Sequence, residues 1–180
     1  MNETIQTLKT RRSVRNFSDK PVEKELIEQI IDAGLWAPSG IGAQAPIIVA
    51  VTNKELRDRL STMNADVMRA AGRGPAGEFD PFYGGPVVLV VLSNKAVPTY
   101  VYDGALVMGN LMNAAKSLGV DSIWIHRAKE EFESEEGKAI LAELGVEGDY
   151  EGIGHCVLGY AETPAGEGAA RKENRVFWAE

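Results

Sequence analysis

Apolar positions follow two different spacings along the chain, and together they predict helices that alternate with strands. Apolar residues recur at helical spacing over 3–12, 23–36, 54–71, 100–118 and 134–144. Short apolar runs, most of them rich in β-branched residues, predict strands at 47–52, 87–92, 121–125 and 153–161. Because a predicted helix separates each strand from the next, we expect a single α+β domain over 1–180, with a central mixed or antiparallel sheet flanked by helices.

Two apolar segments are expected to be covered, either by the rest of the fold or by a partner chain. The predicted helix 100–118 is apolar on more than one side, which is typical of a helix at the centre of a fold or in a subunit interface. Gly119 is expected to end it as a C-cap. The tail ends in the apolar triplet 176–178 after a polar linker, so we expect Trp178 to dock on another surface, such as a partner chain.

The composition excludes several classes of protein. Hydrophobic residues make up 44% and charged residues 25%, the balance of a soluble globular domain. No run of about 18 apolar residues is present, so we expect no membrane span. The first residues lack the apolar core of a signal peptide, which favours a cytoplasmic protein. A net charge of −7 argues against a general nucleic-acid binder.

Strong catalytic groups are scarce. The single cysteine and the two histidines exclude a disulfide within the chain and make a metal site improbable. No G-x-S-x-G motif occurs, and the G-x-G at 72–74 follows no predicted strand. His155 and Cys156 lie in an apolar strand and are expected to be core, while the acids of 130–138 are expected to be a solvated helix start. The chain therefore has either a binding role or a borrowed cofactor.

Two basic clusters occur near the chain ends. The segment 9–15, KTRRSVR, is basic without an acid, and its arginine forks and serine hydroxyl suit phosphate oxygens. The alternative is a solvated helix end whose cations satisfy the helix dipole. The second cluster, Arg171, Lys172 and Arg175, is either an exposed charged tail or the other half of a phosphate clamp.

Three other segments are candidates for a site. The loop 37–46, APSGIGAQAP, combines polar side chains with glycines that allow close approach of the backbone, although a plain helix-to-strand connector is the alternative. The Gly/Pro-rich segment 72–86 is long enough to be functional or mobile. The strand 121–125 ends in His126 and Arg127, which it delivers to a cleft, unless His126 is only a satisfied structural group.

The ordered set of these segments resembles the nitroreductase family of FMN-dependent oxidoreductases, in its smaller branch. The resemblance rests on RRSVRNF, APSGIGAQ, GGPVVLVV, GALVMGNLMNAAKSLGVDSIWI, IGHCVLGYAETP and ARKENRVFW in that order. It covers nearly the whole chain, and the ordered set is specific where a single piece would be weak. The family implies an intertwined homodimer with two FMN sites at its interface.

The resemblance also implies which residues hold FMN. The phosphate and ribityl chain would be bound by the family's R-x-S-x-R segment and by the basic pair near the C-terminus, here Arg11, Arg12, Ser13, Arg15, Arg171 and Lys172. The loop reaching the flavin from the other subunit corresponds to Pro38, Ser39, Gly40, Gly42 and Gln44. Gly40 and Gly42 stand where the family has serine and asparagine, which leaves backbone amides in place of side-chain bonds. Asn64 and Ile125 are further matches to flavin contacts.

By the same resemblance, FMN would carry hydride from NAD(P)H to a nitroaromatic, a quinone or a similar small acceptor in a ping-pong cycle. No side chain is expected to be catalytic, with His126 the only candidate. One alternative is a flavin-binding sensor or carrier with little turnover, which the changes at Gly40 and Gly42 keep open. Reductive dehalogenation or flavin destruction usually needs a large lid, for which 72–86 is the only candidate. A nucleic-acid module would need outward-facing basic patches.

Overall fold

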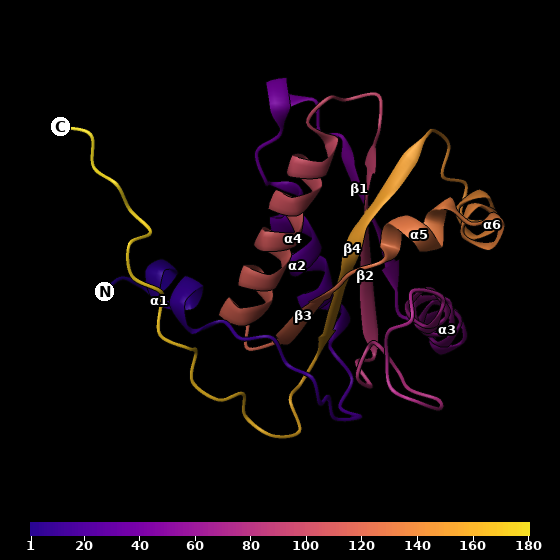
Figure 1. Cartoon of the computed structure of the whole chain (residues 1–180), viewed down its shortest axis with the longest axis horizontal. Helices are drawn as coiled ribbons and strands as arrows, with labels where there is room; N and C mark the ends of the chain where they lie inside the picture. The colour runs from indigo at the N-terminus through magenta and orange to yellow at the C-terminus, as the bar shows by residue number, and fades with distance from the viewer.

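A four-stranded antiparallel sheet forms the middle layer of the molecule, and helices cover both of its faces (Figure 1). The computed structural model describes all residues from 1 to 180. The sheet order is β1-β2-β4-β3, which confirms the expected α+β architecture. The strands are β1 Pro46–Val51, β2 Val87–Asn94, β3 Asp121–Ile125 and β4 Tyr150–Gly159. The helices are α1 Glu3–Thr10, α2 Lys24–Leu35, the 3-10 turn η1 Gly40–Gly42, α3 Lys54–Ala70, α4 Tyr100–Ser117, α5 Ala128–Glu133 and α6 Glu135–Glu143.

The central strand β2 explains why its sequence is a continuous apolar run. Val88, Val90 and Leu92 enter a core shared with α3, α5 and α6. The alternate residues Val87, Leu89 and Val91 enter a second core shared with α2 and α4. Side chains of a strand alternate between the two faces, so a strand covered on both sides needs apolar residues at every position.

Helix α4 is buried as its all-round apolar sequence predicts, but only along part of its surface. Met108 and Leu111 are fully buried against the sheet, whereas Tyr102 and Leu106 remain exposed in the single chain. Gly119 follows the helix with φ of 76°, the left-handed conformation expected of a glycine cap. None of the six α-helices combines the length and the apolar character needed to cross a membrane.

Three predicted features differ from the structure. The strand expected to be buried at 47–52 is the sheet edge β1, only half-buried because it pairs on one side. Helix α5 was missing from the prediction, since six residues are too short for a clear periodic pattern. The acids of 130–138 were expected to be solvated, and for Glu131 this was wrong, because α5 turns that side chain into the interior.

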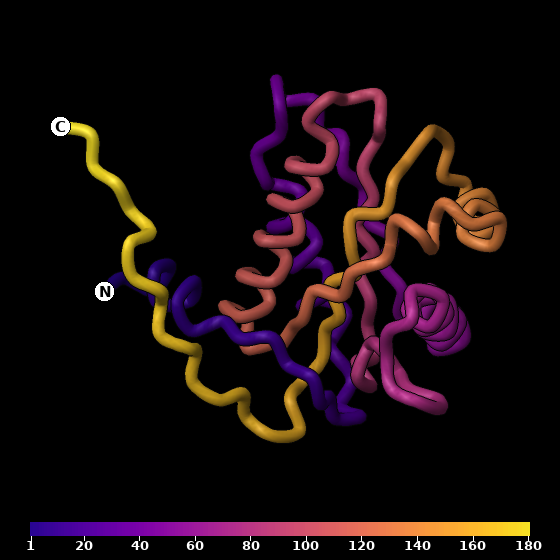
Figure 2. The backbone as a smooth tube through the Cα atoms, in the orientation of Figure 1, coloured from indigo at the N-terminus to yellow at the C-terminus, as the bar shows by residue number.

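The two ends of the chain run alongside one another (Figure 2). Ser18 N donates to Tyr160 O over 2.8 Å, and Glu162 N donates to Asn16 O over 2.9 Å. The tail then turns back past α1, and a Cβ atom added at Gly168 would meet the Arg12 guanidinium at 2.5 Å. Beyond that point the tail forms no helix or strand, and Trp178 is 84% exposed in the single chain.

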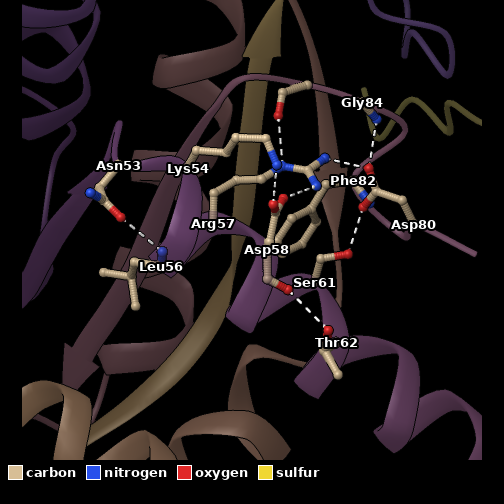
Figure 3. Close-up of polar contacts among 11 residues, drawn as sticks. Asn53, Lys54, Leu56, Arg57, Asp58, Ser61, Thr62, Asp80, Phe82 and Gly84 are labelled. Carbon is tan, nitrogen blue, oxygen red and sulfur yellow. Dashed lines mark hydrogen bonds and ion pairs between the residues drawn. The ribbon is translucent and has the colours of Figure 1, made fainter.

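One carboxylate fixes the second half of the long loop 72–86 (Figure 3). Asp80 forms an ion pair with Arg57 of α3 and accepts hydrogen bonds from Ser61 Oγ at 2.6 Å and Gly84 N at 2.7 Å. Arg57 also donates to Gly85 O over 3.1 Å. The loop is therefore anchored to α3 from Asp80 onwards, and only 72–79 is left as a candidate lid.

We predict that Asp80→Asn lowers the free energy of unfolding by about 1–3 kcal/mol at neutral pH, because it removes the less exposed of the two carboxylates that pair with the buried Arg57 and leaves only Asp58. Burial raises the pKa of Asp80, but hydrogen bonds from Arg57, Ser61 and two backbone N–H groups outweigh it and hold that pKa below its usual value. A lowered carboxyl pKa stabilises the fold above the unfolded-state value of about 4, and this contribution is lost as the pH falls through the folded-state pKa.

Urea unfolding of wild type and Asp80→Asn across a pH series measures both effects. The gap between the two proteins should be largest at neutral pH and should narrow below about pH 4. Asp66→Asn is the matched control, because Asp66 pairs with Arg69 on the exposed face of the same helix. A gap of the same size at every pH would contradict the assignment.

Candidate functional site

Two adjoining pockets open along the edge of the sheet where β3 ends. Their volumes are about 610 and 490 Å³. Both are lined by Met68, Trp124, His126 and Arg127, so they form one continuous depression, which we call the β3 cleft. The first pocket extends towards the start of α4 and the part of β4 beyond β3, and the second lies beside the loop 72–86. The β3 cleft is large enough to take a planar ring system with a substrate beside it.

Three of the predicted site residues lie in the β3 cleft. Arg15 and Ile125 line the second pocket, and His126 lines both. The Arg15 side chain is exposed and has no ion-pair partner within the chain. The His126 ring lies 5.7 Å from the ring of Trp124, measured between centroids. His126 therefore lies at the end of β3 and lines the β3 cleft, and its role there stays a prediction.

The N-terminal basic segment contains a donor that is buried without an acceptor. Arg11 Nη1 is shielded from solvent and makes no hydrogen bond. The Arg11 cation lies near enough to Cys156 to offset in part the effect of burial, which raises the pKa of that thiol to about 12. Buried guanidinium nitrogens are normally paired, so the free Arg11 donor indicates a site for an anion. The protonated Cys156 supplies no nucleophile at neutral pH.

Arg12 and Ser13 each have a structural partner, although Arg12 Nε, like Arg11 Nη1, is buried without an acceptor. Arg12 Nη1 donates to the carbonyl oxygens of Lys9 at 2.8 Å and Arg11 at 2.7 Å. Arg12 therefore pairs with carbonyls at the C-terminal end of α1, which is the alternative role considered for this cluster. Ser13 forms a parallel bridge with Ser122 at the start of β3. This bridge explains how the N-terminal segment is held along the sheet edge beside the β3 cleft.

The tail brings the second basic cluster towards the first. Gly168 contacts Arg12, and Arg171 and Lys172 follow it by three and four residues. At about 3.5 Å per residue, their Cα atoms lie within about 14 Å of that of Gly168. Both side chains are exposed and make no hydrogen bond within the chain. The structure thus places the two basic clusters near each other. That they bind one phosphate together stays a prediction.

The loop 37–46 is held rigidly, but away from the β3 cleft of its own chain. Gly40 N donates to Asp103 Oδ1 over 3.0 Å, and Thr99 Oγ1 donates to Asp103 Oδ2 over 2.9 Å. Ser39 Oγ accepts from Gln44 N over 2.9 Å. No residue of the loop, including Pro38 and Gly42, lines either pocket. Any contribution of this loop to the β3 cleft would have to come from a second chain.

Glycine at position 40 has a local cause. A Cβ atom there would lie 2.2 Å from Thr99 Oγ1, far inside van der Waals contact. Thr99, at the start of α4, therefore occupies the space that the side chain of the family's serine would need at position 40. Gly42 is free of such contacts and instead has φ of 69°, a conformation that glycine adopts without strain.

Exposed apolar side chains gather around this loop. Trp36, Ile41 and Tyr102 are 80%, 102% and 73% exposed. They come from the end of α2, the loop itself and the start of α4, which the Gly40–Asp103 hydrogen bond ties together. Large apolar groups of this kind on a single chain are typical of a surface that another protein covers.

A buried polar network lies directly beneath the β3 cleft. Asn64 and His155 are 0% exposed and Glu131 is 1% exposed. Asn64 Nδ2 donates to His126 O over 2.8 Å and to Glu131 Oε1, while Asn64 Oδ1 accepts from Arg127 Nε over 2.9 Å. Glu131 Oε2 lies 3.0 Å from His155 Nε2. Every polar atom of the Asn64 amide is therefore used within the protein.

This placement changes the role expected of Asn64. A direct contact with a flavin needs an exposed amide, and this amide is sealed inside. It holds the turn at His126 and Arg127 instead. Sequence reasoning missed Glu131. Its spacing places it on the same face of α5 as Ala128 and Phe132, but three positions in a six-residue helix are too few to predict burial. It was correct that His155 is part of the core.

Comparison with known proteins is consistent with this geometry. The model of the nitroreductase family matches residues 8–160. The chain belongs to the nitroreductase family. A nitroreductase of Bacteroides fragilis, solved with bound FMN, is 29% identical over the full length of both chains, with a TM-score of 0.87. Another from Desulfitobacterium hafniense, also solved with FMN, is 25% identical with the same score and coverage.

A curated relative is longer than this member of the family. The oxygen-insensitive NADPH nitroreductase of Salmonella typhimurium is 29% identical over 142 residues, which cover 74% of this chain and 58% of the relative. The chain therefore spans less than two thirds of that relative's length.

We predict that Gly40→Ala lowers the free energy of unfolding by about 1–3 kcal/mol, because the added methyl collides with the Thr99 side chain. The double variant Gly40→Ala/Thr99→Ala should recover part of this loss. Urea unfolding measures both. Gly109→Ala is the matched control, since a methyl at that position in α4 meets no atom within 4 Å. Equal losses in the single and double variants would contradict the close-approach explanation.

Proposed function

We propose that this protein is an FMN-dependent NAD(P)H oxidoreductase that reduces small electrophilic acceptors such as nitroaromatics or quinones. Two observations carry the proposal together. Arg11 in the N-terminal basic segment has a buried, unpaired guanidinium nitrogen, and Arg15 of the same segment lines the two-part cleft of about 610 and 490 Å³. Family membership and the FMN-bound structures of similar chains support the choice of cofactor.

The chain's residues fit such a cofactor. Arg11, Ser13 and Arg15 would hold the phosphate and ribityl chain, with Arg171 and Lys172 added from the tail. Ile125 and His126 would contact the ring edge at the end of β3. When bound, FMN would supply the hydride chemistry that none of these side chains can perform. Donor and acceptor would enter the same open β3 cleft in turn, which is the arrangement of a ping-pong cycle.

We propose further that the working form is a homodimer. The apolar patch of Trp36, Ile41 and Tyr102 and the apolar end of the tail are exposed in one chain. A second copy would cover them and could bring its loop 37–46 to the β3 cleft, which this loop does not reach within its own chain.

The absorption spectrum of the purified protein, followed by anaerobic titration with NADH and NADPH, tests the function directly. We expect a flavin spectrum that one of the donors bleaches, and steady NAD(P)H oxidation once a nitroaromatic or a quinone is added. A protein that binds flavin but does not turn over would be a sensor or carrier instead. Absence of any flavin binding would refute the proposal.

We predict that Arg11→Ala and Arg15→Ala each weaken FMN binding, since the loss of one charge-assisted phosphate contact costs about 1.5–3 kcal/mol. Flavin content after gel filtration and titration of the apoprotein with FMN measure the effect. Arg59→Gln is the matched control, because Arg59 pairs with Glu136 outside the β3 cleft. Full FMN occupancy in the Arg11→Ala/Arg15→Ala double variant would overturn the phosphate assignment.

We predict that Trp36→Glu weakens the dimer, because a buried charge replaces a large apolar contact at its interface. Sedimentation of wild type and variant over a concentration series measures the change. Asp32→Asn, an exposed change on α2 outside the apolar patch, is the control. A monomeric wild type, or a variant dimer of unchanged strength, would contradict the proposed interface.

A further inference from the structure

Arg127 stands at the junction of the two pockets that make up the β3 cleft. Its Nε atom donates to Asn64 Oδ1 over 2.9 Å. Its two terminal nitrogens, Nη1 and Nη2, make no hydrogen bond or ion pair within the chain. Arg127 therefore presents two unused donors to the β3 cleft while its base is held from behind.

The backbone and the buried network both fix the direction of this side chain. Arg127 has φ of 81°, a left-handed conformation that residues other than glycine rarely adopt. The neighbouring carbonyl, His126 O, accepts from Asn64, and the carbonyl before it, Ile125 O, lies 3.3 Å from His155 Nδ1. A guanidinium held in this way loses little conformational freedom when it binds a ligand.

The proton positions in the network follow from its partners. Ile125 O and His126 O can only accept, so His155 Nδ1 and Asn64 Nδ2 carry the protons of those contacts. Arg127 Nε can only donate, which sets the orientation of the Asn64 amide. One proton must then lie between His155 Nε2 and Glu131 Oε2. The contacts of Asn64 with Arg127 and His126 therefore have one consistent arrangement of donors and acceptors.

The charges that line the β3 cleft favour an anion. Arg15, Arg73 and Arg127 line it without an acidic partner. Among the acids, Asp80 is paired with Arg57, and Glu151 is paired with Lys129. Glu130 is the remaining carboxylate. This excess of positive charge occurs in a chain whose net charge is −7.

We propose that Arg127 is a specificity-determining residue whose Nη1 and Nη2 atoms bind a carboxylate on the electron acceptor, with Asn64 as its positioning residue. The substrate class is then an aromatic acceptor that carries a carboxylate. Met68 and Trp124 line both pockets and supply the apolar surface for its ring. The inference rests on the proposed function, because it names the substrate of the same cleft.

The test compares two acceptors of nearly equal shape, 4-nitrobenzoate and the neutral 4-nitrobenzamide, in wild type and Arg127→Gln. We expect wild type to prefer 4-nitrobenzoate, and Arg127→Gln to lower its kcat/KM about 10-fold or more, the effect of one charge-assisted bidentate contact. The kcat/KM for 4-nitrobenzamide should change less than about twofold. Arg59→Gln, on the exposed face of α3, is the control and should leave both values unchanged.

A binding measurement separates this inference from the proposed function. Calorimetry with benzoate and benzamide, on the protein carrying FMN, should show tighter binding of benzoate that Arg127→Gln abolishes. If wild type oxidises NAD(P)H with neither acceptor, the proposed function fails while calorimetry still decides the role of Arg127. Equal affinity of wild type for benzoate and benzamide, or equal losses for both acceptors in Arg127→Gln, would overturn the inference.

The anion bound by Arg127 could also come from the cofactor or the donor. A weaker FMN affinity in Arg127→Gln would assign Arg127 to the flavin phosphate, and a raised KM for NAD(P)H alone would assign it to the donor. Either outcome overturns the proposal. For Asn64→Ala we expect the same selective loss with 4-nitrobenzoate, and little further loss in the Asn64→Ala/Arg127→Gln double variant. Additive losses would show that Asn64 acts separately, and if Asn64→Ala does not fold, Arg127→Gln alone decides.

Discussion

Polar groups sealed between α3, α5 and β4 must find their partners inside the protein, and this requirement shapes the β3 cleft. Asn64, Glu131 and His155 have no access to water. An unpaired polar atom among them would therefore lower the free energy of unfolding by a large fraction of what a domain of this size has. Their mutual hydrogen bonds use the amide, the carboxyl and the imidazole together. The same bonds hold the backbone where β3 ends and the cleft begins.

The sheet places this network where it can act on the surface. β3 is a short edge strand, and β4 continues beyond it, so the chain must leave the sheet at Ile125. Edge positions are where irregular backbone is tolerated, because no further strand has to pair there. The left-handed Arg127 and the short helix α5 occupy that opening. Because a packed core lies beneath this irregular edge, the walls of the β3 cleft are held in place. Such a cleft suits a cofactor that supplies the chemistry itself, since the protein then has only to bind and orient it.

Other parts of the chain bear on the proposed homodimer. The apolar end of the tail and the patch around Trp36 are exposed in one chain, and the loop 37–46 lies away from its own cleft although Asp103 holds it firmly. These features are the support for the proposed dimer, in which each chain would contribute to two sites. The anchoring of the loop by Thr99 and Asp103 explains how glycine can replace the family's serine without loss of shape.

The strands, most of the helices and the family could be predicted from the amino-acid sequence, because long periodic apolar segments and an ordered set of motifs are local properties. The sequence also indicated Arg11, Arg15 and His126 as candidate site residues, from charge clusters and a strand end. Tertiary structure alone decided that β1 is an edge, that Glu131 is buried and that Asn64 points inward. Those outcomes depend on which surfaces meet after folding, and a six-residue helix or a single polar residue within a helix carries too little pattern to reveal them.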